Sequence, residues 1–121
     1  MKLGRDKYSM KKVQEGLKEF RKANIERLFA DYSSERGWSL NDWLVAVTGE
    51  VGEVASLLKL RRKGEDIAVE EIGKELADVV TYIDLLSHKL GIDLGEALCK
   101  KFNEVSVRVG SRQCFVLEGR L

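Results

Sequence analysis

Apolar residues recur at intervals of three and four positions in four stretches of this sequence, at about 9–36, 39–63, 68–90 and 93–110. That spacing places apolar side chains on one face of an α-helix, so the pattern predicts four helices. Each predicted helix is followed by or ends near a glycine: Gly37, Gly64, Gly91 and Gly110. Gly16 and the polar residues around Asn24 leave open a break of the first helix into two.

Residues that favour helix ends support these boundaries. Ser39 or Asn41 can cap the start of the second helix, and Asp93 can cap the start of the fourth. Three cations at 61–63 lie in the last turn of the second helix, where positive charge favours the helix dipole. The joins are short, which favours antiparallel neighbours in a bundle. The tail, 111–121, contains Cys-Phe-Val-Leu, which predicts a short strand or an arm lying on a partner subunit.

Composition narrows the class of protein. The chain has 121 residues and no proline, so it has room for one domain and is free to be nearly all helical. Its net charge of +1 gives no general drive toward nucleic acid or membrane, and neither is expected as a partner. No apolar run approaches the ~20 residues that cross a bilayer. We expect a cytoplasmic protein, since residues 1–12 lack a signal sequence and Cys99 and Cys114 are too few for a disulfide framework.

Four acids in the second and third predicted helices are candidates for a metal site. Glu50 and Glu53 form an ExxE motif, and Glu75 and Asp78 form an ExxD motif. Side chains three residues apart lie one turn apart on the same side of a helix. At ~100° per residue, Glu50 and Glu75 project beside their apolar stripes, where unpaired charge is costly. Two such helices packed face to face would gather four carboxylates, which a hard divalent cation such as Mg²⁺ stabilises.

Two other interpretations fit these acids less well. They could be solvated side chains in a chain that holds 20 acids, but both pairs lie beside apolar stripes on consecutive helices. A di-iron bundle needs Glu-x-x-His motifs; His88, the only histidine, belongs to none and is expected at the surface. Gly49 and Gly52 flank the first pair, and each costs on the order of 1 kcal/mol inside a helix. We therefore expect another helix or a ligand to approach closely there.

The order of these motifs resembles that of the MazG-like all-α nucleoside triphosphate pyrophosphohydrolases. The resemblance rests on ExxE and ExxD with residues 54–74 between them, and it covers about residues 20–111. It extends to the blocks WSLNDW at 38–43, VTGEVGEVASLLKLRR at 47–62, ELADVVTYIDLL at 75–86, GIDLGEAL at 91–98 and KFNEVSVRVGS at 101–111. It implies one domain over 1–121, an all-α four-helix bundle completed by homodimerisation or a homotetramer, and a C-terminal arm at 112–121.

The resemblance also implies an activity. Members of this family hydrolyse the α–β phosphoanhydride of (deoxy)nucleoside triphosphates to the monophosphate and pyrophosphate, which serves to clean or control the nucleotide pool. The implied ligands of Mg²⁺, for which Mn²⁺ could substitute, are Glu50, Glu53, Glu75 and Asp78, with Glu50 as the candidate general base. The candidate substrate-binding residues are Lys59, Lys101 and Asn103 for phosphate and sugar, Trp38, Trp43 and Tyr82 for the base, and Asn24 and Arg27 from a further family block.

Two departures from the family pattern limit which properties of the family can be expected of this chain. Some relatives have a second glutamate just before ExxE, where this chain has Gly49. Relatives selective for deoxycytidine nucleotides have a tryptophan after ExxE, where this chain has Leu60. The preference for base and sugar is therefore left open. A catalytically weak nucleotide-binding helical module on the same scaffold is the alternative function.

Overall fold

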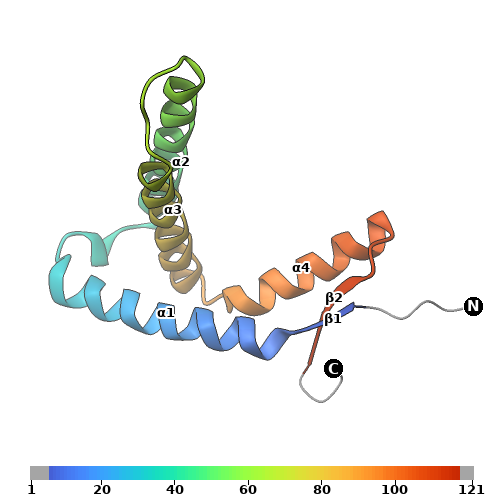
Figure 1. Cartoon of the computed structure of the whole chain (residues 1–121). Helices are drawn as coiled ribbons and strands as arrows, with labels where there is room; N and C mark the ends of the chain where they lie inside the picture. Colours follow the sequence, from blue (N-terminus) through green and yellow to red (C-terminus); the bar gives the residue numbers. More distant parts are fainter. Residues whose placement is uncertain (1–5, 118–121) are drawn as a thin grey trace, which may run out of the picture. The chain divides into compact units, whose positions relative to one another are not determined.

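The computed structural model describes residues 6–117, which form four α-helices and two short strands (Figure 1). The elements are β1 (Asp6–Ser9), α1 (Met10–Asp31), a 3-10 turn η1 (Glu35–Gly37), α2 (Leu40–Arg62), α3 (Val69–Lys89), α4 (Leu94–Val109) and β2 (Gln113–Val116). The prediction of an all-α protein with four helices is confirmed. No helix in the described part of the chain is long and apolar enough to cross a membrane.

The chain divides into two compact units. One, the hairpin unit, is Asn24–Leu90; the other, the terminal unit, combines the residues before Asn24 with those after Leu90. Helix α1 contributes residues to both units and continues through Gly16 and Asn24, so it is not broken at either place. A single domain over 1–121 stays a prediction.

The hairpin unit consists mainly of α2 and α3, which lie side by side (Figure 1). Helix α2 begins after Ser39, whose hydroxyl accepts a hydrogen bond from the Asp42 N–H at 3.2 Å, while Asp42 accepts one from the Ser39 N–H at 2.8 Å. This reciprocal cap satisfies two backbone donors at the start of the helix and lowers the pKa of Asp42. Of the two predicted caps, Ser39 is therefore the one used.

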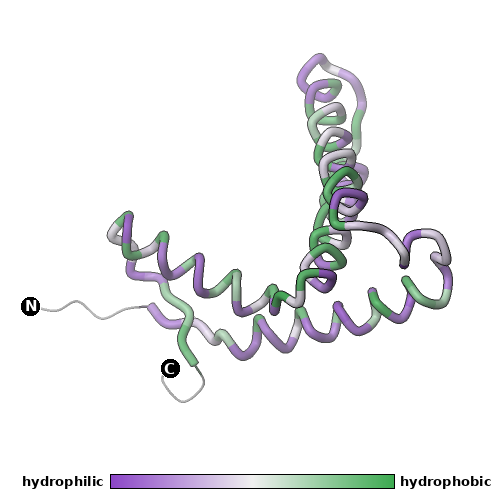
Figure 2. The backbone as a smooth tube through the Cα atoms, turned by 180° about the vertical axis from the view of Figure 1, so that it is seen from behind, coloured by the Kyte–Doolittle hydropathy of each residue, from purple (hydrophilic) through white to green (hydrophobic). Residues whose placement is uncertain are grey.

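The core of the hairpin unit is small. Leu28, Trp43 and Leu85 are buried together, with Trp38 and Tyr82 packed against them. Many apolar side chains along α2 and α3 are left exposed, among them Leu44, Val45, Val51, Leu58, Leu76 and Val80. Figure 2 shows apolar positions along both helices. The hairpin unit thus leaves much of its own apolar surface unburied, although exposed apolar surface is unfavourable in water.

The terminal unit joins the two ends of the described chain. Strand β2 pairs in parallel with β1, with Asp6 opposite Gln113 and Ser9 opposite Val116. The tail therefore forms the strand that its sequence suggested at 113–116, while 118–121 of the predicted arm lie outside the described residues. Asp93 caps α4 as predicted, accepting a hydrogen bond from the Glu96 N–H at 3.0 Å.

The prediction that the first helix reaches Arg36 was wrong. Helix α1 ends at Asp31, and 35–37 form the separate 3-10 turn η1. The Arg36 guanidinium donates a hydrogen bond to the Phe29 carbonyl at 3.0 Å, which satisfies an acceptor near the end of α1. The chain can therefore leave the helix before Gly37, and this early exit brings η1 to the site described next.

Candidate functional site

Three of the four predicted metal ligands form one cluster in the hairpin unit. Glu50 comes from α2, and Glu75 and Asp78 come from α3. Each offers a carboxylate oxygen, and these oxygens all lie within 4.8 Å of one another. The i, i+3 spacing on α3 and the pairing of α2 with α3 produce this arrangement.

Burial makes the cluster costly for the folded chain. Oε2 of Glu50 and Oε2 of Glu75 are buried and have no hydrogen-bond partner among residues 6–117. A buried anionic oxygen without a donor loses its hydration and receives nothing in exchange. The cluster therefore needs a proton or a cation to satisfy these two atoms.

Glu53, the fourth acid, interacts with the cluster through its charge. The nearby Glu75 carboxyl above all, and then burial and the negative charge of Asp78, raise the pKa of Glu53. The nearby Glu50 carboxyl, burial and the negative charge of Asp78 likewise raise the pKa of Glu75, against an opposing contribution from Glu53. The four acids thus behave as one set of like charges, in which binding a positive charge relieves the repulsion.

This donor set suits a divalent metal ion. Carboxylate oxygens are the ligands that Mg²⁺ and Mn²⁺ prefer, and no thiol or imidazole belongs to the cluster. His88 is exposed on α3, as expected from the sequence. The two buried oxygens without donors are the observation that favours a cation here over solvated acids.

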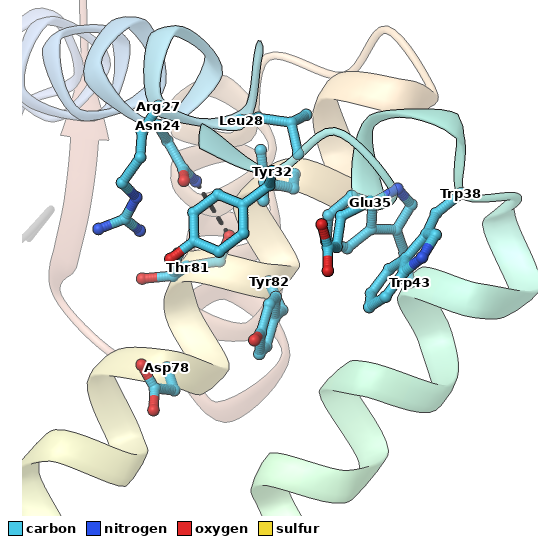
Figure 3. A pocket seen from close by; sticks show the side chains of 11 residues that line it. Asn24, Arg27, Leu28, Tyr32, Glu35, Trp38, Trp43, Asp78, Thr81 and Tyr82 are labelled. Atoms are coloured by element: carbon cyan, nitrogen blue, oxygen red, sulfur yellow. Dashed lines mark hydrogen bonds between the residues drawn. The ribbon is translucent and has the colours of Figure 1, made fainter. Parts of the chain in front are cut away.

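An aromatic pocket adjoins the acids within the hairpin unit. Asp78 lines this pocket together with Trp38, Trp43 and Tyr82 (Figure 3). The rings of Trp38 and Trp43 have centroids 4.6 Å apart, and those of Trp43 and Tyr82 are 6.0 Å apart. Trp43 is only 3% exposed, so it both lines the pocket and belongs to the core. The three aromatic residues predicted to contact a base are therefore brought together.

Asn24 and Arg27 also line the pocket, from α1. The Asn24 amide donates hydrogen bonds to the Thr81 carbonyl at 3.1 Å and to Asp84 Oδ2 at 3.0 Å. The Arg27 guanidinium carbon lies 5.9 Å from the centre of the Tyr32 ring. The donors of Asn24 are thus engaged in linking α1 to α3, whereas Arg27 is the cation of the pocket wall.

The predicted phosphate ligands are divided between the two units. Lys59 lies in the last turn of α2 and is exposed. Lys101 and Asn103 belong to α4 in the terminal unit, where Lys101 pairs with Glu104 at 3.2 Å. The Asn103 amide donates to the Phe115 carbonyl at 2.8 Å and accepts from the Phe115 N–H at 2.7 Å, which ties β2 to α4. Substrate binding by these three residues stays a prediction.

The sequence did not reveal three further polar residues of the pocket, Tyr32, Glu35 and Thr81, and the core residues Leu28 and Leu85 complete its lining. Tyr32 follows Leu28 at helical spacing, and Thr81 precedes Tyr82 in a recognised block, so both could have been inferred from their neighbours. Glu35 offered no such signal, because the sequence placed it in the last turn of a helix that in fact ends earlier.

Comparison with known proteins finds similarity to dCTP pyrophosphatase 1 of several mammals. The chain is 32% identical to the Homo sapiens protein over 94 residues, which covers 66% of this chain and 54% of that protein. It is 31% identical to the Rattus norvegicus protein over 94 residues, with the same coverage. It is 33% identical to the Bos taurus protein over 92 residues, covering 64% of this chain and 53% of that protein. The chain thus spans about half the length of the curated relatives it matches. No family model and no solved structure matches it.

Repulsion among the acids predicts an unusual effect of pH on the metal-free protein. We expect Glu53→Gln to raise the free energy of unfolding at about pH 7, and the gain to shrink as the pH falls. The pKa of Glu53 in the folded chain lies above its ordinary value of 4.5, so the folded state binds this proton more tightly than the unfolded state does. That contribution to stability is complete below 4.5 and is lost as the pH rises through the raised pKa. Glutamine mimics the protonated form.

Urea denaturation with a chelator, between about pH 5 and pH 8, measures this effect. Glu19→Gln, which removes an exposed acid of α1, is the matched control and should show no such dependence. A Glu53→Gln protein less stable than the wild type at the upper end of this range would contradict the account.

Proposed function

We propose that this chain, which is a distant homologue of dCTP pyrophosphatase 1 and belongs to the MazG-like all-α nucleoside triphosphate pyrophosphohydrolases, hydrolyses deoxynucleoside triphosphates to the monophosphate and pyrophosphate. The homology confirms the family resemblance in the sequence. One observation carries the activity: Asp78 belongs both to the acidic cluster and to the aromatic pocket. A metal site for phosphates and a stacking site for a base are thus adjacent on α3.

In this proposal Glu50, Glu53, Glu75 and Asp78 hold Mg²⁺, or Mn²⁺ in its place. The ion, when bound, neutralises charge on the phosphate oxygens and lowers the pKa of a bound water. Glu50 is the acid that we assign as general base, because its carboxylate lies in the cluster that would hold the metal-bound water.

The aromatic pocket takes the base in this proposal. Trp38 and Tyr82 are the partly exposed rings of the pocket against which a flat base can stack, with the buried Trp43 packed behind them, and such stacking contributes ~1–3 kcal/mol per base. Arg27 and Asn24 lie on the α1 side of the pocket, where Arg27 supplies positive charge for the nucleotide. Lys59, Lys101 and Asn103 remain the proposed phosphate and sugar ligands. Using Asn103 would require its hydrogen bonds with Phe115 to be exchanged for the substrate.

We further propose that the active form is a homodimer or homotetramer. The support is the apolar surface that the hairpin unit leaves exposed, including Val51 at 50% and Leu58 at 49% of their full exposure. A Cβ added at Gly49 or Gly52 would meet nothing within 4 Å in the described chain, so the close approach expected there has to come from outside it. A cytoplasmic location, and the lack of nucleic-acid or membrane partners, stay predictions.

Turnover is tested by incubating the protein with each deoxynucleoside triphosphate and Mg²⁺ and resolving the products. We expect monophosphate and pyrophosphate from at least one substrate, and a loss of rate on the order of 10²-fold or more in Glu53→Gln. Glu19→Gln should keep full activity. If no triphosphate yields these products while calorimetry detects nucleotide binding, the chain is instead a catalytically weak nucleotide-binding module.

The contact with a second copy is tested by two matched glycine substitutions. Gly52→Ala should weaken the oligomer by about tenfold or more, because an added methyl group overpacks a close helix contact. Gly16→Ala adds the same group to an open position of α1 and should leave the oligomer unchanged while stabilising the helix by up to ~1 kcal/mol. Sedimentation equilibrium measures both. A monomeric wild type, or two variants that behave alike, would refute the proposed contact.

A further inference from the structure

Glu35 is a pocket residue that the proposed chemistry does not use. Figure 3 shows its carboxylate pointing into the pocket, with Tyr32 and Tyr82 on one side and Trp43 on the other. The negative charge of Glu35 acts on Tyr82, which lines the same pocket. Burial above all, and then negative charges that include Glu50, Asp78 and Glu35, raise the pKa of Tyr82.

The backbone around Glu35 is held in place. The Trp38 N–H donates to the Glu35 carbonyl at 2.9 Å, and the Arg36 N–H donates to the Tyr32 carbonyl at 3.2 Å. The hydrogen bond from the Arg36 side chain to Phe29 adds a third tie between η1 and α1. The carboxylate itself is half-buried, and no hydrogen bond or ion pair to it is seen within residues 6–117. Glu35 is thus an acceptor on a fixed turn, available to a ligand.

The chemistry of a carboxylate restricts what it can meet in this pocket. An ionised carboxylate only accepts hydrogen bonds, and it repels the phosphates of a nucleotide. In Figure 3, Tyr82 lies between Asp78, which marks the metal cluster, and Glu35. A nucleotide with its phosphates at the cluster would therefore present its base to Glu35.

Nucleobases differ in the hydrogen-bond donors on their Watson–Crick edge. Adenine and cytosine each offer an amino group, and guanine offers an amino group beside a ring N–H. Two adjacent donors match the two oxygens of a carboxylate. Thymine and uracil offer one ring N–H between two carbonyl oxygens, which a carboxylate repels. A carboxylate at this position consequently favours bases that carry an amino group, and guanine most of all.

We propose that Glu35 is the residue that reads the base, selecting bases with an amino group, guanine foremost, over thymine and uracil. The inference rests on the proposed function for the placement of the phosphates. A contact between Glu35 and a sugar hydroxyl is the competing arrangement. The aromatic rings on both sides of the carboxylate favour the base, because a flat π-system stacks on aromatic rings over a larger area than a puckered sugar does.

Tryptophan fluorescence tests this proposal without requiring turnover. The chain has two tryptophans, and both Trp38 and Trp43 line the pocket, so quenching reports on that site. Titration with dGMP, dTMP and GMP, in buffer with Mg²⁺, gives the three affinities for the wild type and for Glu35→Gln. Glu19→Gln, which removes an exposed acid of α1, is the control.

We expect the wild type and Glu19→Gln to bind dGMP about tenfold or more tightly than dTMP, and Glu35→Gln to lose most of this preference. Glutamine can donate to a thymine carbonyl, so the affinity for dTMP should rise. A preference that is the same in wild type and Glu35→Gln overturns the proposal, and so does the absence of quenching by either nucleotide. A change confined to the ratio of GMP to dGMP also overturns it, in favour of the sugar contact.

The same titrations separate this inference from the proposed activity. Selective binding that depends on Glu35, with no product from any triphosphate, supports the role of Glu35 and refutes hydrolysis. Product formation with base selectivity that Glu35→Gln does not alter supports hydrolysis and refutes the role of Glu35.

Discussion

Repulsion between carboxylates held close together is the constraint on which this site depends. The pairing of α2 with α3 places oxygens of Glu50, Glu75 and Asp78 within 4.8 Å of one another, and two of the carboxylate oxygens in the cluster are buried without a donor. Such a cluster weakens the fold unless positive charge enters it. The cost is understandable if the site has to bind a metal ion strongly, since the attraction to a cation grows with the same charges and the same burial.

Helix α3 contributes residues both to the acidic cluster and to the aromatic pocket. Asp78 and Tyr82 lie one turn apart, so one rigid helix presents both an acid of the cluster and a ring of the pocket. The buried hydrogen bond between Asn24 and Asp84 ties α1 to the same helix. The turn η1 then brings Glu35 to the pocket on a backbone held by Tyr32 and Trp38. The proposed function therefore assigns phosphate chemistry and base selection to different residues of one small unit.

Local signals in the sequence explain what could be predicted. Ser39 and Asp93 are caps whose partners lie three residues away, so the starts of α2 and α4 were predicted correctly. The acids of the cluster were found because their spacing is local to each helix. The end of α1 was predicted wrongly, since it depends on the contact between Arg36 and Phe29 in a turn without a strong breaker. Strand β1 depends on pairing with β2 at the other end of the chain, and Glu35 enters the pocket only because α1 ends early.

The central claim is that the acids of α2 and α3 form a site for a divalent cation. Electron paramagnetic resonance of Mn²⁺ during titration with the protein tests it most directly, because free and bound Mn²⁺ give different signals. We expect the wild type to bind Mn²⁺ and Glu75→Gln, which removes a buried oxygen without a donor, to bind it about tenfold or more weakly. Equal binding by the two proteins, or no binding by the wild type, would contradict the claim.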